Sequence, residues 1–230
     1  MPKFSSFNAF GSESIETNQS HVPVWLDFVG PVPVGGTLDK AYARPGLLLG
    51  AGAPVNLANK IITPFIAWEV VSKSTSESNT LIIIKPAVFG GVEIVPATTD
   101  FVQKVGATFA ATGKAAAVAA VSALTGDDAG KYQITVLSAN IDTVSAGDYI
   151  ALSSATAGGS GKSLANQPNG YLYNDIYFGN LGGSANGYTL AATGAVVMYH
   201  HGGLLVELTP SAPFKDAMKA AVPGVLQVLV

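Results

Sequence analysis

Short apolar runs separated by glycine, proline and asparagine recur along most of the chain. The clearest are Leu81–Lys85, Val92–Val95 and Tyr132–Leu137, which are rich in β-branched residues. Residues of this kind fit the pleated, half-buried surface of a strand. Short strands bounded by turn residues at such intervals are typical of a sandwich or a barrel. The pattern therefore predicts a mainly β fold, either a β-sandwich or a barrel-like domain.

Some of these runs are apolar on both faces. The segment Ala195–Thr209 predicts a hairpin in which Val196–Tyr199 and Leu204–Leu208 flank a turn that carries Gly202 and Gly203. Successive side chains of a strand point to opposite faces, and both faces of the first run are largely apolar. A strand of this type needs cover on both faces. We therefore expect a second sheet or another subunit to lie against it.

The alanine-rich run Ala115–Leu124 fits a helix or a strand. Alanine has the highest intrinsic helix propensity. A turn cluster, Gly126–Gly130, follows closely, however, and the strand-like run Tyr132–Leu137 comes next. A hairpin of Ala115–Ala123 with Tyr132–Ser138 fits this spacing, so the strand is favoured. Polar loops are predicted at Ser72–Asn79 and over the Gly/Ser/Asn-rich stretch 153–170.

The sequence predicts a helix only near the end of the chain, at about residues 213–222. Ser211 is a candidate N-cap, Pro213 suits the first turn, and Pro223 and Gly224 would end the helix. The tail after it is almost wholly apolar, and a free end of this kind should pair as a strand or lie in an interface. The expected oligomer-interface residues are Val225, Leu226, Val228 and Leu229.

The N-terminal residues 1–22 predict an extended docking arm. This segment is polar except for isolated aromatic residues, and Phe4, Phe7 and Phe10 are costly to leave in water. We expect these three side chains to dock onto a partner. The rest of the chain, residues 23–230, predicts a β-rich body, either as one unit or as two subdomains, 23–112 and 113–230.

Composition points to a chain that packs among partners. Apolar residues make up 48% of the sequence and charged residues only 12%, about half the usual share. The net charge of −3 gives no electrostatic reason to expect nucleic acid or an anionic membrane as a partner. Cysteine is absent, so burial alone must hold the fold. No apolar run reaches ~18 residues, and residues 1–18 do not resemble a signal peptide.

Candidate chemical motifs are weak throughout. The segment Gly158–Ser163 (GGSGKS) lacks the first glycine of a phosphate-binding loop and precedes a Pro- and Gly-containing stretch unsuited to a helix, so a flexible loop is expected. His200 and His201 are adjacent and would point in different directions, which suits turn histidines better than a metal site. The aspartates at 127, 128, 142 and 148 fit turn positions. We therefore expect no enzyme activity, no metal and no cofactor.

Longer segments of the chain share features with a known family. They are a turn followed by short strands, a central hairpin, late aromatic strands and a proline-bounded end: GAPVNLANKIITP with AWEVVSKSTSESNTLIII, GKAAAVAAVSAL with GKYQITVLSANIDTVSAGDYIAL, PNGYLYNDIYF with ATGAVVMYHHGGLLVELTP, and PSAPFKDAMKAAVPGVLQVLV. Over roughly residues 45–230 the chain resembles the head fibre and head decoration proteins of tailed bacteriophages, including phages of Bacteroidetes. The resemblance implies a virion structural protein on the capsid exterior, often a homotrimer, with the major capsid protein as partner and no catalytic residues.

Two other function classes remain open at this point. The aromatic strand Tyr171–Phe178 could serve as a sugar platform in a carbohydrate-binding β-sandwich, although a half-buried strand fits it better. A small all-β hydrolase would need a convergent polar pocket, and the sequence offers no residues for one.

Overall fold

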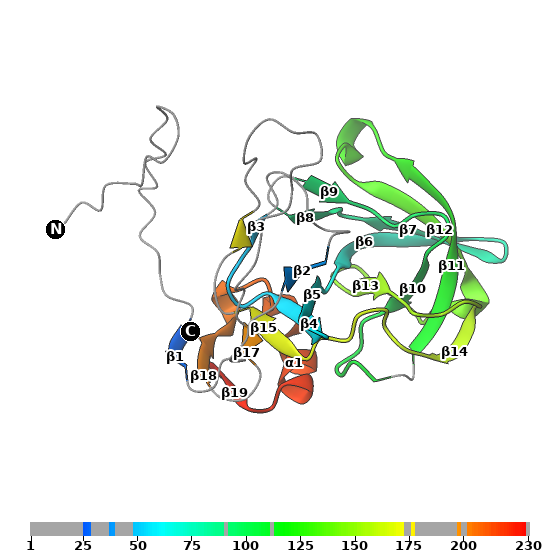
Figure 1. Ribbon diagram of the computed structural model, residues 1–230. Coiled ribbons are helices and arrows are strands. Elements are labelled where there is room, and N and C mark those ends of the chain that lie inside the picture. Colours follow the sequence, from blue (N-terminus) through cyan, green and yellow to red (C-terminus); the bar gives the residue numbers. More distant parts are fainter. Residues whose placement is uncertain are drawn as a thin grey trace, which may run out of the picture.

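The chain is mainly β with one short helix, as the computed structural model shows for residues 25–28, 37–39, 48–89, 92–110, 113–172, 176–177, 197–198 and 202–228. The largest sheet is a closed barrel of antiparallel strands (Figure 1). Its strands are β6 (Ala67–Ser76), β7 (Asn79–Ile84), β10 (Phe101–Lys104), β11 (Gly113–Ala123), β12 (Tyr132–Leu137) and β13 (Tyr149–Leu152).

The ring closes because β10 pairs on both of its edges. The order around the barrel is β10-β13-β6-β7-β12-β11, and β11 pairs again with β10 through the register Phe101 to Ala117. A further strand, β14 (Gly159–Lys162), pairs with β11 outside the ring. A predicted boundary at residue 112 would cut through the barrel, since β7 pairs with β12 and β10 with β11 across it.

The barrel interior is filled by β-branched side chains that alternate along the strands. Ile82 and Ile84 of β7 and Ile134 and Val136 of β12 are fully buried in one cluster. Trp68 lies in the same cluster and donates its indole N–H to the carbonyl oxygen of Ile94, 2.8 Å away. This hydrogen bond attaches a short hairpin to the barrel, namely β8 (Ala87–Phe89) with β9 (Val92–Ile94).

The second part of the molecule is built from strands that precede and follow the barrel in the sequence. One sheet pairs β1 (Trp25–Phe28), β18 (Gly202–Leu205) and β19 (Val225–Val228). Another has the order β17 (Val197–Met198), β15 (Gly170–Leu172), β4 (Pro54–Ala58), β5 (Ile61–Pro64) and β2 (Thr37–Leu38). A short pair joins β16 (Ile176–Tyr177) to β3 (Leu48–Leu49).

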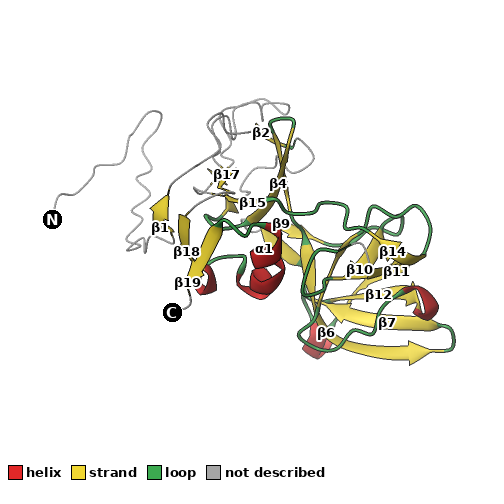
Figure 2. Cartoon of the chain, turned by 90° about the horizontal axis from the view of Figure 1, so that it is seen from below, coloured by secondary structure: helices red, strands yellow, loops and turns green. Residues whose placement is uncertain are grey.

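A single α-helix in the described chain lies between β19 and the barrel (Figure 2). This helix, α1 (Lys215–Ala221), follows the 3-10 turn η5 (Ala212–Phe214), and the predicted C-terminal helix is thereby confirmed. Its buried residues Ala217 and Met218 pack into a second core with Phe65, which precedes β6, and with Tyr171 of β15. Among the described residues, the other 3-10 turns are η2 (Gly126–Asp128), η3 (Ser138–Asn140) and η4 (Val206–Leu208).

The central hairpin is confirmed as a strand pair. Residues Val118 to Ala123 of β11 pair with Val136 to Tyr132 of β12, so the alanine-rich run is a strand. A strand forms despite the helix propensity of alanine, because side chains at the start of β11 are needed to fill the barrel. Ala116 and Val118, for example, are buried.

Three sequence predictions are corrected. Ser72–Ser76 belongs to β6 and pairs with β7 around a tight turn at Glu77, so the polar stretch 72–79 is mostly a strand whose side chains are exposed. Gly159–Lys162 is a strand that pairs with β11, because the edge of β11 beyond β12 is open to it. Polarity alone does not distinguish a loop from a strand that extends past the core.

The predicted hairpin of Ala195–Thr209 is the third correction. Within the described residues, β17 pairs with β15 while β18 pairs with β1 and runs parallel to β19. Gly202 and Gly203 therefore lie in a strand between two partners, and Val206–Leu208 is a 3-10 turn.

Gly52 lies at a tightly packed point in the second part of the molecule, and a substitution there tests how much that packing contributes to stability. Its φ of +78° is a conformation that favours glycine, and a Cβ there would lie 2.6 Å from Thr209 Cγ2. We expect Gly52→Ala to lower the free energy of unfolding by about 2–4 kcal/mol, because backbone strain and overpacking act together.

Gly130→Ala is the matched control for Gly52→Ala. Gly130 has a similar φ of +82° but nothing within 4 Å of its Cβ position. We expect this variant to lose only about 1 kcal/mol, from backbone strain alone. Urea unfolding of both variants measures the difference, and equal losses would show that the contact with Thr209 relaxes without cost.

Candidate functional site

Two pockets lie where the barrel meets the C-terminal segment. Each has a volume of about 200 Å³, and they share Tyr149, Pro213 and Phe214 as lining residues. Tyr149 is the first residue of the barrel strand β13, whereas Pro213 and Phe214 belong to η5. The site therefore joins segments that are about 65 residues apart in the sequence.

A chain of aromatic edges holds the two segments together. Phe214 lies edge-on to Tyr149, with ring centroids 4.9 Å apart, and edge-on to Phe65, at 5.1 Å. Phe65 also contacts Phe109 at 5.3 Å. Edge-to-face aromatic pairs are worth about 0.5–1.5 kcal/mol each beyond the area they bury. These contacts give the pockets a wall that is fixed before anything binds.

The first pocket is apolar. Four of its lining residues are prolines, which present rigid hydrocarbon surface and no backbone N–H; they are Pro54, Pro64, Pro210 and Pro213. Phe65 and Phe214 supply the aromatic wall, and Val88 stands at the margin with its side chain 58% exposed. A pocket of this composition suits a single apolar or aromatic side chain.

The second pocket is more polar. Gly106 and Gly147 line it with backbone, and Asp148 and Asp216 contribute carboxylates. Burial, reinforced by the negative charge of Glu69, raises the pKa of the Tyr149 hydroxyl above its ordinary value of 10, so this group stays neutral even at moderately alkaline pH. The arrangement suits a small polar group or a cationic side chain.

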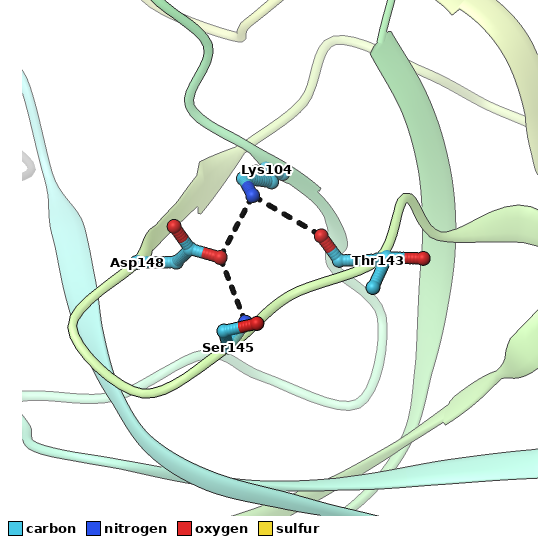
Figure 3. Close-up of polar contacts among 4 residues, drawn as sticks. All are labelled: Lys104, Thr143, Ser145 and Asp148. Atoms are coloured by element: carbon cyan, nitrogen blue, oxygen red, sulfur yellow. Dashed lines mark hydrogen bonds and ion pairs between the residues drawn. The ribbon is translucent and has the colours of Figure 1, made fainter.

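The Asp148 carboxylate organises the turn beside this pocket (Figure 3). It accepts hydrogen bonds from the Lys104 ammonium and from the backbone N–H of Ser145, each 2.7 Å away. Lys104 Nζ also donates to the carbonyl oxygen of Thr143 at 3.1 Å. Burial alone would raise the pKa of Asp148, but these hydrogen bonds and the charge of Lys104 outweigh it and hold the pKa below its ordinary value of 3.8. Asp148 is thus a turn residue, as its sequence context predicts.

The predicted interface residues of the tail have different environments. Val225 is buried in the second core and its backbone pairs with Gly202, so its side chain is not available to a partner. Leu226 points outward with 69% of its surface exposed, and Val228 is half-buried. Leu229 lies outside the described residues, as do Phe4, Phe7 and Phe10 of the predicted arm.

The first residue of the aromatic strand considered as a sugar platform is not accessible to a sugar. Tyr171 is fully buried and accepts a hydrogen bond from Gln227 Nε2 at 2.9 Å. Burial raises the pKa of its hydroxyl to about 12. Gln227 also donates to the carbonyl oxygen of Lys215 at 2.6 Å, so this pair ties β15, β19 and α1 together. The structural role of Tyr171 explains its position in the sequence.

Other candidate motifs do not converge on the pockets. Asp142 accepts a long-range hydrogen bond from the backbone N–H of Lys114 in β11, and Asp128 pairs with Lys131 at the η2 turn. His200 and His201 lie outside the described residues. Across the part of the chain that the structure describes, no three His, Cys, Asp or Glu side chains come close enough together to hold a metal ion. No helix in that part is long and apolar enough to cross a membrane.

The comparisons with known proteins add no relative. No family model, no curated protein and no solved structure matches the chain.

Sequence reasoning missed the pockets. Their only local signal is the number of prolines around Pro64 and Pro213, which the sequence presents as breaks between strands. That these prolines face one another depends on the docking of η5 against β13, and no spacing along the chain encodes it.

The Asp148 carboxylate makes stability depend on pH. Because its pKa is lowered in the folded chain, its contribution is complete above pH 4–5 and is lost as the pH falls through the folded-state pKa. We expect Asp148→Asn to lower the free energy of unfolding by about 1 kcal/mol at pH 7. The difference from wild type should shrink towards zero as the pH falls through the folded-state pKa of Asp148.

Asp127→Asn is the control for this measurement, because Asp127 is exposed at the η2 turn. Urea unfolding between pH 2.5 and 7 measures both variants. A loss in Asp148→Asn that stays constant over this range would mean that the charge of the carboxylate plays no part.

Proposed function

We propose that this chain is a structural protein of a tailed-phage particle, a head fibre or head decoration protein on the capsid exterior. The family resemblance over residues 45–230 supplies the biological setting. A β-rich body with a low charge content suits a protein that is held among copies of itself and its neighbours.

The edge strand β19 is the observation that carries the assembly part of this proposal. In the described residues β19 ends its sheet, with β18 on one side and no strand on the other. Leu226 stands exposed on it, and the tail that follows is apolar. Native proteins usually cover such an edge or protect it with charge, because it can pair with another chain. A partner in an assembled particle would supply this cover.

The proposed partners are the major capsid protein and further copies of this chain. Phe4, Phe7 and Phe10 provide apolar anchors in an otherwise polar arm. Their burial against the capsid would contribute about 2 kcal/mol each before the entropy of ordering the arm is subtracted. The chain enters its body at β1, which belongs to the same sheet as β19. Because β1 and β19 are the two outer strands of this sheet, the arm and the exposed edge would flank it.

Capsid binding is tested by co-sedimentation with capsids of the same phage that lack this protein. We expect the full chain to sediment with the capsids and a variant without residues 1–20 to stay in the supernatant. Failure of the full chain to bind would overturn the capsid proposal. Equal binding of the shortened variant would remove the arm from it.

The oligomeric state is tested by light scattering of the purified protein. We expect a mass about three times the 23.4 kDa of one chain at micromolar concentration. A mass of one chain under these conditions would be incompatible with the proposed homotrimer.

A further inference from the structure

Part of the outer face of the barrel, between the Glu69–Lys85 ion pair and the turn at Glu77, carries no ionisable side chain. It covers four neighbouring strands, β6, β7, β12 and β11, and in the register of the sheet its residues lie in matched rows. We call it the neutral face; its residues are Ser72, Ser74, Ser76, Asn79, Leu81, Ile83, Ala120, Ser122, Gln133, Thr135 and Leu137.

The register shows that these side chains share one side of the sheet. Thr135 is paired with Leu81 on one neighbour and with Ala120 on the other, and Leu81 is paired with Ser74. Paired residues in an antiparallel sheet project to the same face. The intervening residues, such as Ile82, are fully buried in the barrel, so the neutral face points outward.

The neutral face is not covered by the chain itself. All its residues are exposed or half-buried, and Leu137 exposes 42% of its surface. β7 is apolar on both sides, because Leu81 and Ile83 face outward while Ile82 and Ile84 fill the barrel. A strand that is apolar on both faces is normally covered on both. The outer side of β7 therefore lacks its cover in the isolated chain.

We propose that the neutral face is the surface through which copies of this chain associate, with a second copy as its occupant. The lack of charge on the neutral face favours a second copy over a charged partner. A charged partner surface would lose hydration here without gaining an opposite charge, which is costly. A second copy of the same face brings no ionisable group and so meets neither like-charge repulsion nor an unpaired buried charge.

The short side chains also favour self-association. Serine, threonine and alanine lose little conformational entropy on burial, so docking two such faces costs less than docking long charged side chains. Three such faces can gather around a common axis with their outward side chains in contact. In such a contact Leu81 and Ile83 would form the apolar centre, and the hydroxyl and amide groups around them would form the rim.

The size of the neutral face makes it the centre of a contact rather than the whole. Four strands at about 4.8 Å and five residues at about 3.4 Å along each cover about 300 Å². A stable interface takes about 800 Å² from each partner. In a closed trimer each face would contact the faces of both neighbouring copies, so the buried areas add around the common axis.

This inference rests on the self-association in the proposed function, but it places the contact away from the tail. The neutral face lies on the barrel and β19 lies at the other end of the protein in both views (Figures 1 and 2). The two surfaces can therefore be altered independently.

The test places like charges on the neutral face. Ser74 and Ser122 are exposed on its two outer strands, so Ser74→Glu with Ser122→Glu should leave the fold intact. We expect this double variant to be a monomer by light scattering at concentrations where wild type is an oligomer. Mixing it with the double variant Ser74→Lys with Ser122→Lys should restore a mixed oligomer, which a misfolded protein could not form.

Two further variants separate the outcomes. Thr99→Glu with Thr156→Glu adds the same charge at exposed turns next to β10 and β13, opposite the neutral face in the ring, and should keep the wild-type mass. Leu226→Glu alters the edge strand β19 and should also keep it.

An oligomer that persists in the Ser74→Glu, Ser122→Glu variant but dissociates in Leu226→Glu would overturn this inference while the proposed assembly stands. An oligomer that dissociates equally in the turn variant would also overturn it, because net charge would then be the cause. A monomeric wild type would overturn both the inference and the proposed trimer.

Discussion

Closure of the barrel by β10 is the constraint on which the rest of the structure depends. This four-residue strand pairs with β13 on one edge and with β11 on the other, and without it the ring would be an open sheet. Gln103 in its middle is buried, and its amide group lies 2.8 Å from both the carbonyl oxygen of Lys162 and the N–H of Leu164. With the amide nitrogen toward the carbonyl, both groups are paired, and β10 is also tied to the segment around β14.

A closed barrel directs how the protein can meet others. Each strand of the ring is paired on both edges over part of its length, so the ring leaves fewer free backbone groups than an open sheet would. The sheet of β1, β18 and β19 is open and ends in an edge strand with Leu226 exposed. The described residues thus offer two kinds of exposed surface, a face of side chains on the barrel and a backbone edge at the other end. Under the proposed function, one surface would serve copies of this chain and the other would serve the capsid.

The aromatic contacts around Phe214 keep these two ends in a fixed relation. Phe214 and Tyr149 bring η5 against β13, and Gln227 links β19 to α1 and to Tyr171. The same packing leaves the pockets between these segments. The prolines that line them cannot donate backbone hydrogen bonds to a neighbouring strand. Because these contacts hold the two ends rigidly together, partners bound at the two ends would be held at a fixed distance and angle.

The sequence by itself determined the strands and the helix that have a strong local signal. β-branched alternation specified β7 and β12, and Pro213 with the apolar stripe of Phe214, Ala217 and Met218 specified α1. For the candidate site it specified only the turn that Asp148 holds, because an aspartate bonds to backbone groups a few residues away.

Only the tertiary structure decided which strands pair and what faces outward. Ser72–Ser76 and Gly159–Lys162 are strands because neighbouring edges were available to them, although their composition is that of loops. Val225 is buried and Leu226 exposed because one face of β19 packs on the second core, and Pro64 and Pro213 line one pocket because η5 docks on the barrel. Pairing and docking join residues far apart in the chain, and their free energy depends on partners that no local pattern names.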